Sequence, residues 1–414
     1  MTGVISKYNI RFNSYERKKN LFLNTILFFI PLFILFLVDM LSLNTSGVLG
    51  YLDEIIAIYY LGYIFLNIIL YNNVKLLKWM LILFAFVLLG ILGNVFVSIQ
   101  NISLYWLLLD IFFFIKPFIY LIATISFFKK NYNKHLISIV SNFSKICLIF
   151  IFLGAIFHLF KNNFNINYIW NVDRYSFTTP HCVTLAKYLI LFILCVLLSE
   201  SKHKVFYFIL GLISIIISTS GAGILSYFLI FIFFFIFPKY KLKWYHLTIV
   251  GILAILLGWN EISGYLLDDT QARSITYIYS FVTANRYFPL GSGFGTYGGY
   301  SAAYNYSNLY ISYGFNNVWG LSQYNLTDGN CFLFDTYYPM IIAQFGYIGL
   351  VLFLLILILI FNKLFREKKY LSISFMLCLL VIAFGFNITS PATCILFVVG
   401  GLIYNTEQMQ QIKK

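Results

Sequence analysis

Charged residues are scarce in this sequence: they make up 10% of its 414 residues, whereas 61% are hydrophobic and the mean hydropathy is +0.86. A soluble protein of this length buries a core but still needs a charged surface, so the composition excludes that class. The apolar residues come in runs of about 17–25 residues, the length at which a helix crosses a bilayer, and not in the short alternating strands of a β-barrel. We therefore expect an all-α integral membrane protein.

The sequence also lacks the spacings that bind metals or carry redox chemistry. Its six cysteines form no Cys-x-x-Cys pair and no His/Cys cluster. Cys182 and Cys331 fall in predicted outer loops, where they either form a disulfide or stay free. The other four lie in apolar runs and are typical of small core residues: Cys147, Cys195, Cys378 and Cys394.

Internal repeats and paired broken helices are missing as well, which argues against a secondary transporter. About 12 transmembrane helices are expected within a single transmembrane domain over residues 1–414, and the first apolar run is too long for a cleavable signal. One long extracytoplasmic loop, about residues 264–334, precedes the tenth helix. The expected spans are residues 20–41, 54–72, 79–98, 104–127, 137–160, 183–199, 204–219, 220–237, 246–263, 335–362, 370–388 and 391–405.

The net charge of +14 follows this topology. Most lysines and arginines lie in the N-terminal segment, in alternate links and in the C-terminal tail, and the positive-inside rule places that side in the cytoplasm. Both termini are therefore expected to be cytoplasmic, and no nucleic-acid partner is implied. The exceptions are the basic residues in outer loops and within spans: Lys161, Arg174, Arg273, Arg286, Lys116, Lys145 and Lys187.

Arg273 and Arg286 lie in the long loop, whose charge balance is negative, so they do not set the topology. Each either pairs with a nearby carboxylate or grips phosphate oxygens, because a guanidinium is always charged and binds phosphate bidentately. Arg174 lies seven residues before His181 in another large outer loop, about residues 161–182, and allows the same two interpretations. A histidine such as His181 is more often a hydrogen-bonded polar residue than a catalyst.

Asp335 begins the tenth span, where a carboxylate either caps the free N–H groups of the helix or takes a proton from a hydroxyl. Alternating glycines in residues 289–295 allow a tight turn or an anion nest of successive N–H groups. Asp110, Lys116 and Lys145 lie within spans, where a charge costs about 2.5–3.5 kcal/mol at mid-bilayer. They should face a cavity or a partner: the lysines neutralise an anionic ligand, or Asp110 neutralises one of them.

Three stretches of the sequence are distinctive when taken in order. They are Arg174-Tyr-Ser-Phe-Thr-Thr-Pro180-His181; Arg273-Ser-Ile-Thr-Tyr with Pro289-Leu-Gly-Ser-Gly-Phe-Gly-Thr-Tyr; and Asp335-Thr-Tyr-Tyr with Gly346-Tyr-Ile-Gly349-Leu. In this order they resemble the superfamily of O-antigen polymerases and O-antigen ligases, whose members have many spans and a long extracytoplasmic loop late in the chain. In ligases the third stretch usually starts His-Asn, and Asp335 stands at the equivalent place here, which favours a polymerase. A fourth segment, Ser218-Thr-Ser-Gly-Ala-Gly, lacks the arginine that is frequent in the family.

The resemblance implies a lipid-carrier-dependent glycosyltransferase in the bacterial cytoplasmic (inner) membrane. It would polymerise undecaprenyl-diphosphate-linked oligosaccharide repeat units into O-antigen, capsule or exopolysaccharide, with inversion at the anomeric carbon and no metal or other cofactor. Its partners would be the lipid bilayer, a flippase and a chain-length regulator. Two alternatives remain: a ligase that moves the glycan to another acceptor, and a polysaccharide flippase or other transporter, whose critical charges should line a path through both leaflets.

The same resemblance implies roles for individual residues. Arg174 and Arg273 would hold the diphosphate, with Arg286 as a third contact. Asp335 would deprotonate the acceptor hydroxyl, and His181 is the second candidate for that base. The tyrosine-rich long loop would hold the glycan, and the residues expected to contact substrate there and at the tenth span are Tyr287, Gly293, Gly295 and Tyr338.

Overall fold

Helices are the only regular secondary structure of the computed structural model within the residues that it describes, and these contain no strand. Residues 1–23, the basic N-terminal segment, and residues 163–173 of the predicted outer loop at about 161–182 lie outside them. The described residues are 24–43, 47–71, 74–97, 99, 102–131, 134–162, 174–239, 244–257, 259, 263–264, 268, 270–328 and 330–412.

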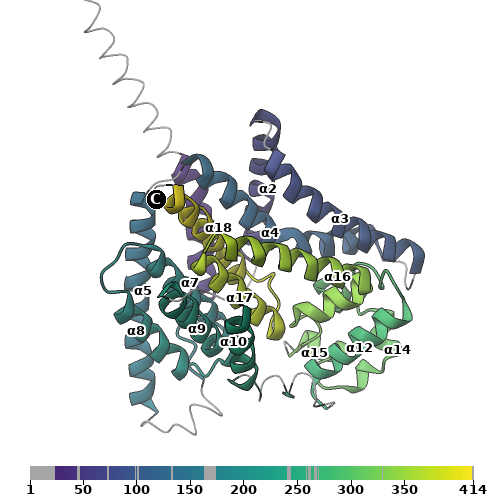
Figure 1. Ribbon diagram of the computed structural model, residues 1–414. Coiled ribbons are helices and arrows are strands. Elements are labelled where there is room, and N and C mark those ends of the chain that lie inside the picture. Colours follow the sequence, from purple (N-terminus) through teal and green to yellow (C-terminus); the bar gives the residue numbers. More distant parts are fainter. Residues whose placement is uncertain are drawn as a thin grey trace, which may run out of the picture.

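The helices follow the apolar segments of the sequence, and the arrangement is drawn in Figure 1. Before the long loop they are Asn24–Met40, η1 (Gly47–Tyr51), α2 (Leu52–Tyr71), α3 (Val74–Val97), α4 (Leu104–Asn131), α5 (Lys134–Lys161), α7 (Cys182–Leu198), α8 (Lys204–Ile217), α9 (Gly221–Ile230), η2 (Phe231–Ile236), η3 (Phe237–Lys239) and α10 (Trp244–Leu257). The loop and the last helices give α12 (Ala272–Arg286), α13 (Tyr300–Tyr304), α14 (Asn308–Ser312), η4 (Phe315–Asn317), α15 (Gln323–Thr327), α16 (Tyr337–Arg366), α17 (Tyr370–Gly385) and α18 (Pro391–Ile412).

Six of the described helices are long and apolar enough to cross a membrane: Leu49–Leu70, Leu76–Val97, Leu104–Phe128, Lys134–Lys161, Gly221–Lys239 and Tyr337–Arg366. Shorter apolar helices accompany them, including α7, α8 and α17. The predicted all-helical class is confirmed, and the chain has the character of a multi-pass membrane protein. The predicted number of about 12 spans stays a prediction.

Helix α7 lies inside the bundle. Every residue from Leu185 to Leu198 is buried, as expected for a helix that is apolar all round. Helices α5, α8, α9, α17 and α18 all pack against it. In contrast, few side chains are fully buried along α3, α5 and the part of α16 after Gly349, which suits helices that face lipid.

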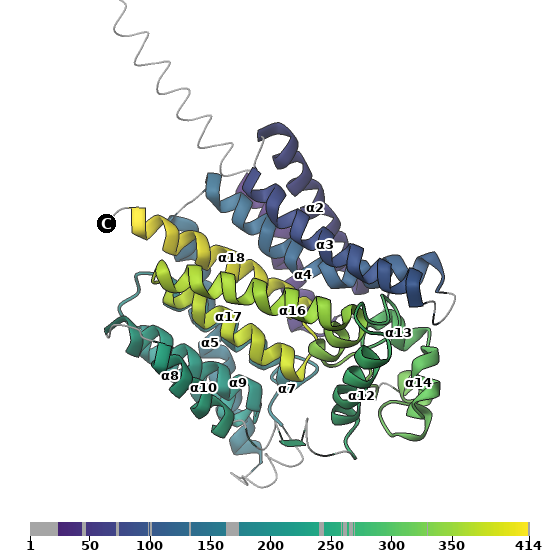
Figure 2. The same cartoon turned by 45° about the vertical axis from the view of Figure 1, so that its right-hand side comes forward.

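The long loop folds around its own aromatic core instead of extending from the bundle. Its short helices gather at one end of the molecule, far from the C-terminal end of α18 (Figures 1 and 2). Tyr297, Tyr310, Phe315 and Leu321 form the centre of this core and are fully buried. Helix α12 packs along α16, so the loop is fixed to the helices that flank it.

A kink in α16 ties this loop to the bundle. Gly346 has φ 59° and ψ −159° inside the helix, a conformation that is essentially restricted to glycine. The N–H groups of Ser292 and Gly293 donate to the carbonyls of Ala343 and Gln344 at 2.8 and 3.0 Å. The segment after α12 therefore supplies hydrogen bonds that the kink removes from the helix.

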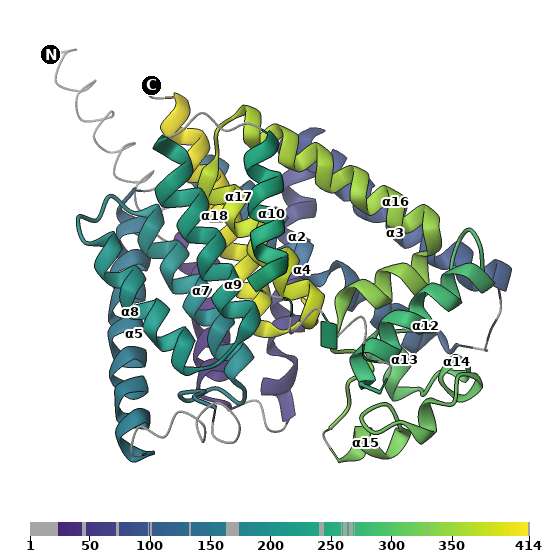
Figure 3. The same cartoon turned by 60° about the horizontal axis from the view of Figure 1, so that its bottom comes forward.

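The links between helices sort into two ends of the bundle (Figure 3). Lys134 at the start of α5 pairs with Glu200, which follows α7, at 3.0 Å. Glu407 near the end of α18 accepts hydrogen bonds from the N–H groups of Leu371 and Ser372 at the start of α17. These basic-rich links, which the sequence predicts to be cytoplasmic, therefore lie together, at the end opposite the folded loop.

Candidate active site

The structure brings together two of the predicted catalytic residues, Arg273 and Asp335. The Arg273 Nη2 donates a hydrogen bond to Asp335 Oδ2 at 2.7 Å. The two side chains are 24% and 26% exposed, so the pair remains reachable by a ligand. Hydrogen bonds between ionised partners are short and strong, and this one joins residues that are 62 positions apart in the sequence.

The helix ends explain how each side chain reaches this point. Arg273 is the second residue of α12. Asp335 stands immediately before Thr336, which occupies the N-cap position of α16. The prediction that Asp335 caps the helix is therefore wrong, because Thr336 occupies the N-cap position. The Asp335 carboxylate instead accepts a hydrogen bond from Arg273.

Two aromatic rings complete the surroundings of Arg273. Its guanidinium carbon lies 5.1 Å from the ring centre of Phe332 and 5.5 Å from that of Phe386. Stacking on aromatic faces stabilises a guanidinium and restricts its orientation. Phe332 belongs to the end of the long loop and Phe386 to the link between α17 and α18, so the pair lies where these segments meet.

The link between α17 and α18 forms hydrogen bonds with the segment that carries Asp335. The Asn387 side chain donates to the carbonyl of Phe334, the neighbour of Asp335, at 2.9 Å. Its own Oδ1 accepts from the Thr389 N–H at 3.0 Å. The Tyr277 hydroxyl of α12 donates to the Phe384 carbonyl at 2.6 Å. These bonds fix the starts of α12 and α16 on the same turn.

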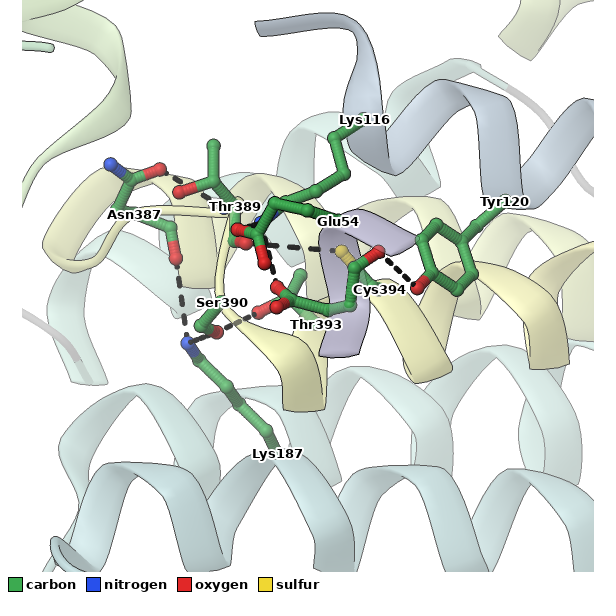
Figure 4. A network of polar contacts seen from close by, with 10 residues as sticks. Glu54, Lys116, Tyr120, Lys187, Asn387, Thr389, Ser390, Thr393 and Cys394 are labelled. Atoms are coloured by element: carbon green, nitrogen blue, oxygen red, sulfur yellow. Dashed lines mark hydrogen bonds and ion pairs between the residues drawn. The ribbon is translucent and has the colours of Figure 1, made fainter. Parts of the chain in front are cut away.

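Lys187 reaches this turn from the buried helix α7 (Figure 4). Its Nζ donates to Ser390 Oγ at 2.8 Å and lies 3.4 Å from the Asn387 carbonyl. The residue is 5% exposed. Within the described part of the chain, no carboxylate oxygen lies within 4.0 Å of this ammonium group. A buried cation is therefore linked through Asn387 to Phe334, the residue before Asp335.

A second buried lysine approaches the start of α18 from the other side (Figure 4). Lys116 of α4 is 1% exposed, and its Nζ pairs with Asp53 at 2.6 Å and with Glu54 at 3.0 Å. The Tyr120 hydroxyl donates to the Asp53 carbonyl at 2.9 Å. The hypothesis that Asp110 neutralises Lys116 is therefore wrong, because two carboxylates of α2 do so.

Asp110 instead holds the glycine-rich segment. Its Oδ2 accepts from the Gly295 N–H at 2.7 Å and from Gln344 Nε2 at 2.8 Å. The Gly293 N–H donates to the Gln344 carbonyl. Both glycines are buried. The anion bound by this segment is thus the Asp110 carboxylate of the protein itself. The structure does not bring Gly293 or Gly295 to the Arg273–Asp335 pair.

The other predicted clamp arginines form no ion pair with Asp335 among the described residues. Arg286 is the last residue of α12, so about 20 Å of helix separates it from Arg273. Its exposed guanidinium lies 5.5 Å from the Tyr287 ring centre. Arg174 and His181 are exposed in the link before α7, and His181 takes the N-cap position without a side-chain cap bond. Only Arg273 of the predicted basic residues contacts Asp335 in the described structure.

Most of the loop tyrosines serve the fold. The hydroxyls of Tyr297 and Tyr306 donate to backbone carbonyls, and burial raises the pKa of Tyr306 to about 12. Burial also raises the pKa of Tyr287 despite the neighbouring Arg286. The Tyr338 hydroxyl donates to the Leu380 carbonyl at 2.9 Å, so this residue fixes α16 to α17.

Part of the aromatic set remains accessible beside the pair. Tyr304 is 44% exposed, and its ring centre lies 4.2 Å from that of Tyr300. Tyr300 also contacts Phe334, the neighbour of Asp335, at 5.6 Å between ring centres. Trp319 is 69% exposed and contacts Phe332. Exposed rings of this kind offer faces for an apolar or sugar ligand.

The structure also shows how the two loop cysteines and the residues that could bind a metal are placed. Cys182 and Cys331 are both free, so the predicted option of a disulfide between them is wrong. Burial raises the pKa of the Cys331 thiol to about 11. In the described portion of the chain, no three His, Cys, Asp or Glu side chains are grouped so that they could hold a metal ion.

Sequence reasoning missed the contribution of the α17–α18 turn. The stretch Phe386-Asn-Ile-Thr-Ser-Pro391 places three polar residues between two apolar runs, and this interruption was the available signal. No family model, no curated protein and no solved structure matches the chain.

Proposed function

We propose that this chain is a membrane-embedded glycosyltransferase that polymerises undecaprenyl-diphosphate-linked oligosaccharide repeat units at the outer face of the bacterial cytoplasmic membrane. The observation that carries the proposal is the partly exposed Arg273–Asp335 pair. It unites two of the three sequence stretches that resemble the O-antigen polymerases. The pair lies at the end of the bundle opposite the basic-rich links.

The chemistry of the pair suits such a transfer. Departure of a lipid diphosphate builds negative charge on phosphate oxygens, and a preorganised cation stabilises it. A guanidinium has five N–H donors in a planar fork, so Arg273 keeps one bond to Asp335 and directs others at phosphate. A carboxylate beside that phosphate accepts the proton of the attacking hydroxyl. The Arg273–Asp335 pair therefore provides both the contact for the diphosphate of the glycosyl donor and the base for the hydroxyl of the acceptor.

The revised assignment differs from the one that the resemblance alone implies. Arg273 is the main diphosphate contact and Asp335 the base, because they are adjacent. Arg174 and His181 remain candidates on a neighbouring link. Arg286, at the far end of α12, is left out of the diphosphate contacts. The exposed faces of Tyr304 and Trp319 extend the site for the glycan.

The test is polymerisation in membrane vesicles that contain undecaprenyl-diphosphate-linked repeat units and no nucleotide sugar. The wild-type chain should produce a glycan ladder, and Arg273→Ala should lose it. Arg366→Ala is the matched control, because Arg366 is an exposed arginine at the other end of α16, and it should retain the ladder. An intact ladder in Arg273→Ala would refute the role of the pair.

A transporter of lipid-linked oligosaccharide is the second candidate. It is favoured by one observation, the buried charges of Lys116, Lys187 and Asp53 inside the bundle. Charged residues within membrane spans often mark a substrate or ion path. Vesicles that move the lipid-linked unit across the bilayer but make no ladder would select this alternative.

A further inference from the structure

A polar cleft lies at the end of the bundle opposite the Arg273–Asp335 pair. It has a volume of about 290 Å³ and is open on one side. The start of α5, the link after α7 and the end of α18 form its walls. The residues that matter for its chemistry are Lys134, Ser141, Lys145, Ser199 and Glu200.

The cleft carries one cation without a matching anion. Lys134 pairs with Glu200 at 3.0 Å. The Lys145 Nζ donates to Asn142 Oδ1 at 3.0 Å and lies 5.8 Å from the ring centre of Tyr207. Of the carboxylates in the described ranges, none lies within 4.0 Å of the Lys145 ammonium group. The lining therefore has a surplus of one positive charge.

The position of the cleft matches the headgroup level of a membrane. Helix α5 has 28 residues, which corresponds to about 42 Å, whereas the hydrocarbon layer is about 30 Å thick. Its first turns thus extend beyond the hydrocarbon. The Lys145 side chain leans toward the helix start, and its Nζ lies level with Asn142. Lys145 therefore reaches from within the span back toward the headgroups, as long basic side chains near helix ends do.

Hydroxyl groups line the same cleft. Ser141 Oγ donates to Ser199 Oγ at 2.8 Å, and Ser199 Oγ donates to the Val196 carbonyl at 2.9 Å. The hydroxyls that can donate to a ligand here are therefore those of Ser138 and Ser201, which also face the space. Hydroxyls beside one ammonium group suit an acceptor-rich anion such as phosphate. Basic pockets between membrane helices bind anionic headgroups in this way.

We propose that the cleft between α5, the α7–α8 link and α18 binds the phosphate group of an anionic phospholipid, with Lys145 as its cationic contact. This site is independent of the proposed transferase reaction, since none of its residues belongs to the Arg273–Asp335 pair. Its ligand is a component of the surrounding bilayer that holds three helices together at this end.

The experiment is lipid retention by the full chain, purified in detergent and measured by native mass spectrometry with added phosphatidylglycerol or phosphatidylcholine. Wild type should retain phosphatidylglycerol in preference to phosphatidylcholine. Lys145→Gln should bind phosphatidylglycerol about tenfold more weakly, because a charge-assisted hydrogen bond is lost. Lys145→Arg should retain it. Lys239→Gln, which removes an exposed lysine outside the cleft, should behave as wild type.

Two results would overturn the proposal. Equal retention of phosphatidylglycerol by wild type and Lys145→Gln would show that Lys145 does not bind the lipid phosphate. Binding of inorganic phosphate that depends on Lys145, without any preference for phosphatidylglycerol, would show a free-phosphate site instead of a lipid site. Unfolding temperatures of the variants, measured without lipid, separate loss of binding from loss of the fold.

Discussion

Arg273 Nη2 and Asp335 Oδ2 lie 2.7 Å apart, where the starts of α12 and α16 meet. The contact closes the long loop, because Arg273 stands in its first helix and Asp335 at its end. The same contact holds a carboxylate and a guanidinium in a partly exposed position. A single ion pair therefore fixes the loop and, in the proposed reaction, supplies the guanidinium for the diphosphate and the carboxylate for the acceptor hydroxyl.

The identity of the cation at this pair should matter beyond its charge. Arg273→Lys keeps one positive charge but loses the planar fork that binds carboxylate and phosphate together. We expect glycan polymerisation to fall by about tenfold to a hundredfold in this variant, while the chain still folds. Polymerisation rates and unfolding temperatures should be measured side by side. An unchanged rate would contradict a bidentate role for Arg273.

The buried Lys116 should be important for stability. Replacing it by alanine leaves Asp53 and Glu54 buried without their cation, and breaking a buried pair in this way costs about 3–5 kcal/mol. Lys134→Ala is the control, because the Lys134–Glu200 pair is largely exposed and such a pair contributes about 0–1 kcal/mol. Denaturant or thermal unfolding in detergent measures the difference. Equal effects of the two substitutions would contradict the assigned network.

The kink of α16 should tolerate no side chain. A Cβ at position 346 would meet the backbone of Gly291 and Pro289, and φ there is +59°, so Gly346→Ala should destabilise the fold by about 1–3 kcal/mol or more. Gly62→Ala is the matched control, because nothing lies near a Cβ at that position of α2. There alanine should be neutral or stabilising by up to about 1 kcal/mol. Wild-type stability in Gly346→Ala would refute the kink.

The Cys331 thiol should react slowly near neutral pH. Burial raises its pKa to about 11 from the ordinary value of 9.0, so the reactive thiolate is scarce at pH 8. Alkylation by iodoacetamide, followed by peptide mass spectrometry, should accelerate as the pH rises toward 11. Because the folded state favours the neutral thiol, the stability that this shift contributes should be lost as the pH rises from about 9 to about 11. Alkylation at pH 8 as fast as that of unfolded chain would contradict this burial.

The helices could be predicted from the sequence because long apolar runs leave little choice in lipid. The partners of the buried charges could not: Lys116 takes carboxylates from α2, and Asp110 binds a loop that lies far along the chain. The tyrosines illustrate the same difficulty, since spacing does not distinguish the buried Tyr297 from the exposed Tyr304. Such pairings depend on how distant segments pack, which local patterns do not encode.

Replacing the Asp335 carboxylate tests most directly whether this residue is the base of the proposed polymerisation. Vesicles with undecaprenyl-diphosphate-linked repeat units and no nucleotide sugar should be compared for wild type, Asp335→Asn and Asp328→Asn. Asp328 is an exposed aspartate of the same loop. We expect a full ladder for wild type and Asp328→Asn, and at least about a hundredfold slower polymerisation for Asp335→Asn. A full ladder with Asp335→Asn would contradict this assignment of the base.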